Sequence, residues 1–148
     1  MFRTPPRRLL LLTAAALSLV GCGDTAGTAP ADPPSPADTS LTVEFSPEGT
    51  DVQDTYQLEC DGGAPVGSSA APDPAAACAA VAAQGTDLFA PPDPNLACTQ
   101  IIAGMQRAQV SGTVDGETVD RQFSLTNGCE IAHWKSLTGL LGPAEGLL

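Results

Sequence analysis

Two short stretches of the chain alternate apolar and polar residues. Leu, Val and Phe occupy every second position from residue 41 to residue 45, and Tyr, Leu and Cys do the same from residue 56 to residue 60. Because successive side chains of a strand point to opposite faces, a period of two is typical of a half-buried strand. Each stretch is therefore predicted to form a strand with one face toward a core.

An alanine-rich run from residue 73 to residue 84 predicts a helix. Asp73 can cap its first turn, Pro74 suits the first helical position, and Gly85 follows as a stop signal. Cys78 is expected on the inner face of this helix. A disulfide from Cys78 to Cys60 would pin the helix to the strand that ends there.

A tight hairpin is predicted at Asp115-Gly116, which stands between β-branched residues in the segment from 110 to 119. Two long antiparallel strands flank this turn, and the second is expected to end at Leu125. A short helix should open within residues 127–130, and apolar residues then recur at intervals of three and four, which places them toward the core. These residues are Ile131, Trp134, Leu137 and Leu141. Strands and helices that segregate in this way indicate an α+β domain.

The first 22 residues match a bacterial lipoprotein signal. Three arginines precede an apolar stretch of twelve residues, 9–20, and the leader closes with Leu-Val-Gly-Cys at 19–22. This stretch is shorter than the ~20 residues that a membrane-spanning helix needs. The pattern predicts export, removal of residues 1–21, and acylation of Cys22 as a membrane anchor on the outer face of the cell. The alternative is an ordinary secretory leader with a chance cysteine.

Residues 22–40 are predicted to be the lipidated cysteine and a disordered linker rich in Pro and Ala, and residues 41–148 a single domain. The linker has no large apolar residue to bury. Without the leader the chain keeps three basic and seventeen acidic residues, a formal charge of −14. Such acidity argues against a nucleic-acid partner, because a phosphate backbone attracts basic surfaces. We interpret it as solvation of an exported protein.

Four cysteines remain in the predicted domain: Cys60, Cys78, Cys98 and Cys129. An even number in an oxidising compartment predicts two disulfides, which small domains with modest cores commonly need. Four cysteines allow three pairings, and the residues alone leave them open, with sequential pairing as the simplest. The spacings do not match paired zinc ligands, so no metal or other cofactor is predicted.

No motif in the chain predicts an enzyme. There is neither a Gly-x-Ser-x-Gly elbow nor a His-Glu-x-x-His motif, and a catalytic triad would have to use the single histidine, His133. A calcium loop of alternating carboxylates is also missing. His133 and Trp134 are interpreted as packing residues of the last helix.

From Tyr56 onward the chain resembles the Streptomyces subtilisin inhibitor family of proteinase inhibitors. The matching residues are YQLEC at 56–60, Ala-Cys at 77–78, Gly-Thr-Asp-Leu at 85–88, Cys98, Val-Asp-Gly at 114–116, and FSLTNGCE at 123–130. They occur in the family's order over about ninety residues. The resemblance implies a twisted antiparallel sheet of about five strands with two helices and two disulfides.

The resemblance also implies the disulfide pairing and the functional loop. Cys60 would pair with Cys78 and Cys98 with Cys129, and a protease-binding loop would follow Cys98. The residues carried over by position are Thr99, Gln100, Ile101 and Ile102 in the loop, and Asn127 as its brace.

Within this loop Gln100 would be the primary specificity residue, and the scissile bond would join it to Ile101. Thr99 stands where the family commonly has a proline, whose φ angle is fixed. The stretch from Cys98 to the hairpin is about one residue longer than usual for the family. If that residue precedes the scissile bond, Ile101 takes the specificity position instead.

The leading hypothesis is a secreted, lipid-anchored inhibitor of subtilisin-like serine endopeptidases, with the membrane and the protease as its partners. An uncharged Gln100 gives a trypsin-type pocket with a buried aspartate little to bind, whereas a subtilisin-like pocket accepts varied side chains. The competing hypothesis is a non-inhibitory lipoprotein module that binds another envelope protein. Family members often dimerise through the exposed face of the sheet, so the resemblance also implies a homodimer.

Overall fold

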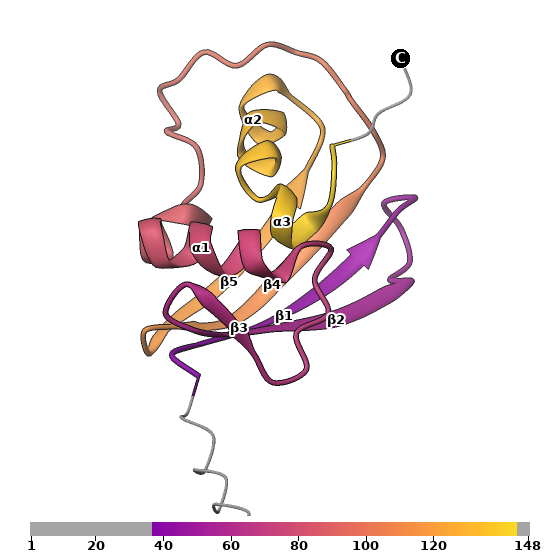
Figure 1. Ribbon diagram of the computed structural model, residues 1–148. Coiled ribbons are helices and arrows are strands. Elements are labelled where there is room, and N and C mark those ends of the chain that lie inside the picture. Colours follow the sequence, from indigo (N-terminus) through magenta and orange to yellow (C-terminus); the bar gives the residue numbers. More distant parts are fainter. Residues whose placement is uncertain (1–36, 145–148) are drawn as a thin grey trace, which may run out of the picture. The chain divides into compact units, whose positions relative to one another are not determined.

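The strands predicted from the alternating stretches belong to one five-stranded antiparallel sheet of order β3-β2-β1-β4-β5 (Figure 1). The computed structural model describes residues 37–144, which lie within one compact unit. The strands are β1 (Thr39–Ser46), β2 (Asp54–Asp61), β3 (Ala64–Val66), β4 (Arg107–Val114) and β5 (Glu117–Ser124). The strand β1 thus begins two residues before the domain boundary predicted at residue 41.

Helices cover one face of this sheet (Figure 1). They are α1 (Pro74–Gln84), the 3-10 helix η1 (Gly85–Phe89), α2 (Gly128–Ser136) and the four-residue α3 (Thr138–Leu141). The α+β class with two longer helices and two disulfides is confirmed. The predicted signal peptide, the acylation of Cys22 and the linker up to residue 36 lie outside the described residues. No helix within residues 37–144 is long and apolar enough to cross a membrane.

The core lies between the sheet and its covering helices. Leu41, Val43 and Leu58 from β1 and β2 are at most 1 % exposed, as is Trp134 from α2. The predicted alternation is therefore confirmed at these positions. Tyr56 is half-buried, and its hydroxyl donates a hydrogen bond to the carbonyl of Leu140 at 2.8 Å.

The predicted hairpin joins β4 to β5. Asp115 and Gly116 have φ angles of 50° and 80°, which is the backbone that a two-residue type I′ turn requires. In the neighbouring ladder Gly112 pairs with Leu41 and has a φ of 141°. A Cβ atom at Gly112 would lie 2.1 Å from the carbonyl oxygen of Ser40, so only glycine permits β1 and β4 to approach this closely.

The first helix forms as its sequence signals predict. The side chain of Asp73 accepts a hydrogen bond from the amide of Ala76 at 3.0 Å, and α1 ends at Gln84. The chain then continues into η1 instead of leaving the helical conformation at Gly85. Cys78 is fully buried on the inner face of α1.

The second helix is interrupted inside its apolar repeat. It ends at Ser136, Leu137 has φ and ψ angles of −106° and 18°, and α3 begins at Thr138. The residues predicted to face the core are nonetheless buried, namely Ile131, Trp134, Leu137 and Leu141. The break divides the apolar repeat between two helices without exposing the apolar side chains.

The opposite face of the sheet is polar. Its side chains alternate with the core positions along the strands and include Ser40, Thr42, Glu44, Thr55, Gln57, Glu59, Gln109, Ser111, Thr113, Thr118, Asp120 and Gln122. The large exposed apolar residues of the described chain all lie elsewhere, in a hairpin tip and in one loop. This face therefore lacks the apolar centre that is typical of a stable protein interface.

Candidate functional site

The segment from Ala90 to Gln106 is the long coil that passes α2 in Figure 1 and joins η1 to β4. Of the five large apolar residues exposed in the described chain, four belong to it: Leu96, Ile101, Ile102 and Met105, which are 53–67 % exposed. Large apolar side chains that are exposed singly need no explanation, but their concentration in one segment makes that segment the candidate interaction site. The predicted reactive residues therefore lie in the most exposed apolar part of the described protein.

The N-terminal side of the loop is held to the start of α2. Cys98 forms a disulfide with Cys129, and the amide of Gly128 donates a hydrogen bond to the carbonyl oxygen of Thr99 at 3.0 Å. One covalent and one hydrogen bond thus fix residues 98 and 99 against the body of the domain.

A second backbone contact holds the loop further along. The amide of Ala103 donates a hydrogen bond to the carbonyl oxygen of Leu125 at 2.8 Å. Between this bond and the one at Thr99 stand Gln100, Ile101 and Ile102, whose side chains are all exposed. The fold therefore presents a three-residue projection between two backbone anchors.

The side chain of Asn127, which was expected to brace the loop, makes its hydrogen bonds with the first turn of α2. Its carboxamide oxygen accepts hydrogen bonds from the amides of Cys129 and Glu130, both at 3.0 Å, so this side chain is the N-cap of α2. The first turn of α2 in turn carries Cys129, which holds the loop. Asn127 thus supports the loop through the helix end, and a direct contact with the loop stays a prediction.

Both disulfide pairings implied by the resemblance are present, Cys60–Cys78 and Cys98–Cys129. Cys60 and Cys78 are fully buried, whereas Cys98 and Cys129 are partly exposed beside the loop. The first bridge therefore joins α1 to β2, and the second joins the loop at Cys98 to the first turn of α2.

The C-terminal side of the loop has a fastening that the sequence reasoning missed. The guanidinium Nη1 atom of Arg107 donates to the carbonyl oxygens of Met105 at 2.9 Å and Gln106 at 2.8 Å. Gly49, at the tip of the β1–β2 hairpin, packs against the same Met105 carbonyl. The signal in the sequence was a basic residue directly after the loop in a chain with few basic residues.

The two residues interpreted as packing residues, His133 and Trp134, lie in α2 and make packing contacts there. The Nε2 atom of His133 lies 2.7 Å from the carbonyl oxygen of Leu88, and its ring meets Phe123 edge to face at 5.0 Å. Trp134 is buried and donates from Nε1 to the carbonyl oxygen of Gly142 at 3.1 Å. These contacts join α2 to η1, β5 and the C-terminal segment.

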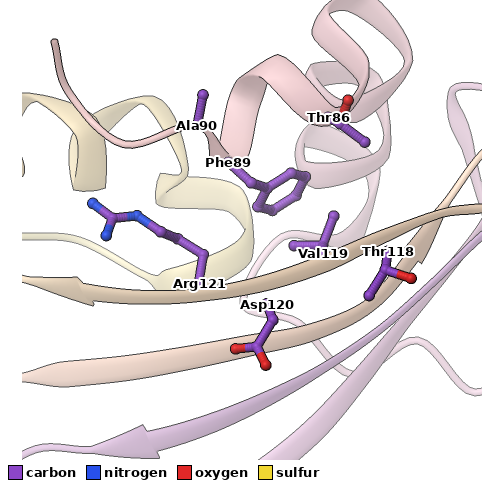
Figure 2. Close-up of a pocket in the computed structure, with 7 residues that line it drawn as sticks. All are labelled: Thr86, Phe89, Ala90, Thr118, Val119, Asp120 and Arg121. Atoms are coloured by element: carbon purple, nitrogen blue, oxygen red, sulfur yellow. The ribbon is translucent and has the colours of Figure 1, made fainter.

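A shallow hollow between η1 and the edge of β5 is lined by Thr86, Phe89, Ala90, Thr118, Val119, Asp120 and Arg121 (Figure 2). Its volume of about 150 Å³ is below the ~300 Å³ at which small-molecule sites begin. The guanidinium of Arg121 is already paired with Glu130 at 2.9 Å. Residues 37–144 also bring together no group of three or more His, Cys, Asp or Glu side chains that could hold a metal ion.

Comparison with known proteins found no matching family model and no similar curated protein. The assignment to the inhibitor family therefore stays a prediction that rests on the residues quoted above.

Proposed function

We propose that this protein inhibits subtilisin-like serine endopeptidases by presenting residues 99–102 as a substrate-like loop. The observation that carries the proposal is the exposed projection of Gln100, Ile101 and Ile102 between the hydrogen bonds at Thr99 and Ala103. The partly exposed disulfide beside the projection adds a covalent anchor.

The physical reason is pre-organisation. A protease binds its substrate as an extended strand, and a flexible peptide loses about 0.5–1.5 kcal/mol of binding free energy for each side chain that must be ordered. A loop already held at both ends avoids much of that loss. It also keeps the two ends of a cut bond close together, so cleavage does not release the protease from a tight complex.

The chemistry of the projection favours a protease with a broad, uncharged specificity pocket. Gln100 carries no charge, and Ile101 and Ile102 are more than half exposed. A pocket with a buried carboxylate would leave that charge unpaired, which is strongly unfavourable. The subtilisin-like class fits these side chains better than the trypsin-like class.

The location that we propose for this activity is the outer face of the cell membrane. Two disulfides indicate an exported protein. Acylation of Cys22 would anchor it there, and the linker would let the domain reach a protease near the surface at a high effective concentration. The polar outer face of the sheet gives no support to a homodimer, which we leave out of the proposal.

Charge substitutions in the loop test the proposal by a gain of function. If Gln100 enters the specificity pocket, Gln100→Lys should turn the protein into a trypsin inhibitor, because the new ammonium pairs with the buried aspartate of that pocket. If the loop register is shifted by one residue, Ile101→Lys should have this effect instead. Ile102→Lys is the control, since it adds the same charge outside either predicted position.

Each outcome of the Lys series has a clear meaning. Trypsin inhibition by one variant and subtilisin inhibition by the wild type would establish the inhibitor and its register. Failure of all three variants, together with no subtilisin inhibition by the wild type, would contradict the proposal. The exposed apolar loop would then belong to a module that binds another envelope protein.

A further inference from the structure

The C-terminal side of the loop is fastened by Arg107, the first residue of β4, which pairs with Ser46 at the end of β1. One guanidinium nitrogen, Nη1, donates to two successive carbonyl oxygens, those of Met105 and Gln106. Hydrogen bonds from a charged donor are about twice as strong as neutral ones. The two peptide groups that precede β4 are thus oriented by a side chain that the sheet itself positions.

The backbone of Gly49 closes the same corner from the other side. This residue lies between β1 and β2, and its amide donates to the carbonyl oxygen of Ser46 at 3.2 Å. Its φ angle is 75°, and a Cβ atom there would lie 2.4 Å from the carbonyl oxygen of Met105. Glycine therefore allows the hairpin tip to lie directly against Met105. We call Gly49, Arg107 and the Met105 carbonyl the C-terminal clamp.

The clamp matters after the loop is cut. Hydrolysis adds one water across the Gln100–Ile101 bond and leaves a carboxylate on Gln100 and an α-ammonium group on Ile101. Resynthesis on the protease reverses this step and returns the water. It is efficient only if the Ile101 amine stays close to the carbonyl carbon of Gln100, because proximity supplies a high effective molarity.

The two new chain ends are held by different contacts. Gln100 is two residues from the disulfide at Cys98, so its piece stays in place covalently. Ile101 begins a piece whose first anchors are the hydrogen bond from Ala103 to Leu125 and then the clamp. A single peptide hydrogen bond frays readily at a free chain end, so the clamp limits how far that end can move.

We propose that Arg107 is a positioning residue that, together with Gly49, retains the Ile101 end of the cut loop and so keeps the equilibrium between cut and intact inhibitor near the intact form. This inference rests on the proposed function, and it adds the residues that make cleavage reversible. Its partner is the same protease, which supplies the catalytic serine for both directions.

The test measures the ratio of cut to intact protein at equilibrium with a trace of subtilisin, approached from both sides and read by mass spectrometry. Arg107→Ala should raise this ratio about tenfold, the loss expected for one charge-assisted hydrogen bond. Arg107→Lys should restore most of the wild-type ratio, because its ammonium group can still donate to the Met105 carbonyl. Lys135→Ala, which removes the same charge from an exposed site on α2, should leave the ratio unchanged.

A second variant and a second readout separate this inference from the proposed function. Gly49→Ala keeps every charge but pushes on the Met105 carbonyl, and it should raise the ratio in the same direction as Arg107→Ala. Hydrogen exchange of the Ala103 amide, measured without protease, should be faster in both variants than in the wild type and in Lys135→Ala.

An unchanged ratio together with unchanged exchange at Ala103 would overturn the role of Arg107, even if the wild type inhibits subtilisin well. If the wild type does not inhibit at all, the proposed function fails. The exchange rates of the Ala103 amide alone then decide whether the clamp holds the loop. Equal rates in the wild type and all variants would overturn the role proposed for Arg107 and Gly49.

Discussion

The disulfide Cys98–Cys129 offers the sharpest test of how the loop is held. Replacing both cysteines by alanine should leave the fold intact, because these residues are partly exposed at the edge of the core. The bridge spans 31 residues, and the chain-entropy relation gives a loss of about 4 kcal/mol in the free energy of unfolding. The loop should at the same time lose its covalent N-terminal anchor.

The bridge Cys60–Cys78 is the matched comparison. It spans 18 residues, so the same relation gives about 3 kcal/mol. Both of its cysteines are fully buried, however, and removing two sulfur atoms from the core leaves a cavity that adds roughly 1–2 kcal/mol. We therefore expect the two double variants to be destabilised by similar amounts. Only the Cys98→Ala/Cys129→Ala variant, however, loses the covalent anchor of the loop that follows residue 98.

The assay combines urea unfolding with limited proteolysis. Trp134 is the only tryptophan of the chain and is buried, so its fluorescence reports unfolding of the core. At a urea concentration where both variants remain folded, subtilisin should cut the Cys98→Ala/Cys129→Ala protein rapidly between residues 99 and 103. The Cys60→Ala/Cys78→Ala protein should resist at that place. Equal cleavage rates at the loop in the two variants would refute the reasoning.

Three further predictions concern the supports of the fold. Asn127→Ala should lower the free energy of unfolding by about 1 kcal/mol through loss of the N-cap of α2, whereas Asn127→Asp should retain most of it in the same urea titration. Burial, and to a lesser extent the charge of Asp54, raises the pKa of Tyr56 from 10.0 to about 12. The pKa of Tyr56 is thus higher in the folded than in the unfolded state. The contribution of its protonated form to the free energy of unfolding is therefore complete below pH 10 and is lost as the pH rises toward 12. Thermal melts at several pH values should show a smaller fall in melting temperature between pH 10 and 12 for Tyr56→Phe than for the wild type. An equal fall in the two proteins would contradict the assignment of this pH dependence to Tyr56. Gly112→Ala should destabilise the domain by at least about 2 kcal/mol, because the new Cβ meets the Ser40 carbonyl and the φ angle is unfavourable; a wild-type melting temperature would contradict the close approach of β1 and β4.

Local chemistry explains which elements were predictable from the sequence. Asp73 and Pro74 mark the start of α1 by their own capping and φ preferences, and Asp115-Gly116 selects its turn without help from the rest of the chain. The break at Leu137 was not predictable in this way. Neither glycine nor proline stands at residue 137 itself, Gly139 follows only inside α3, and apolar residues are buried on both sides of the break.

The candidate site was predictable only in part, for the same reason. The residues alone left the disulfide pairing open. The two pairs and the loop after Cys98 were expectations from the family resemblance, which rests on short motifs that can be recognised along the chain, and both pairs are present. The clamp could not be predicted, since Gly49 and Arg107 come together only when β1 pairs with β4. Contacts that depend on strand register leave no local pattern in a single sequence.

The most direct measurement is a titration of subtilisin activity with purified residues 23–148, followed by mass spectrometry of the inhibitor. The account predicts stoichiometric loss of activity with slow, incomplete cleavage confined to the Gln100–Ile101 bond or the bond after it. Full subtilisin activity at a molar excess of the protein, or rapid and complete digestion of the loop, would contradict the account.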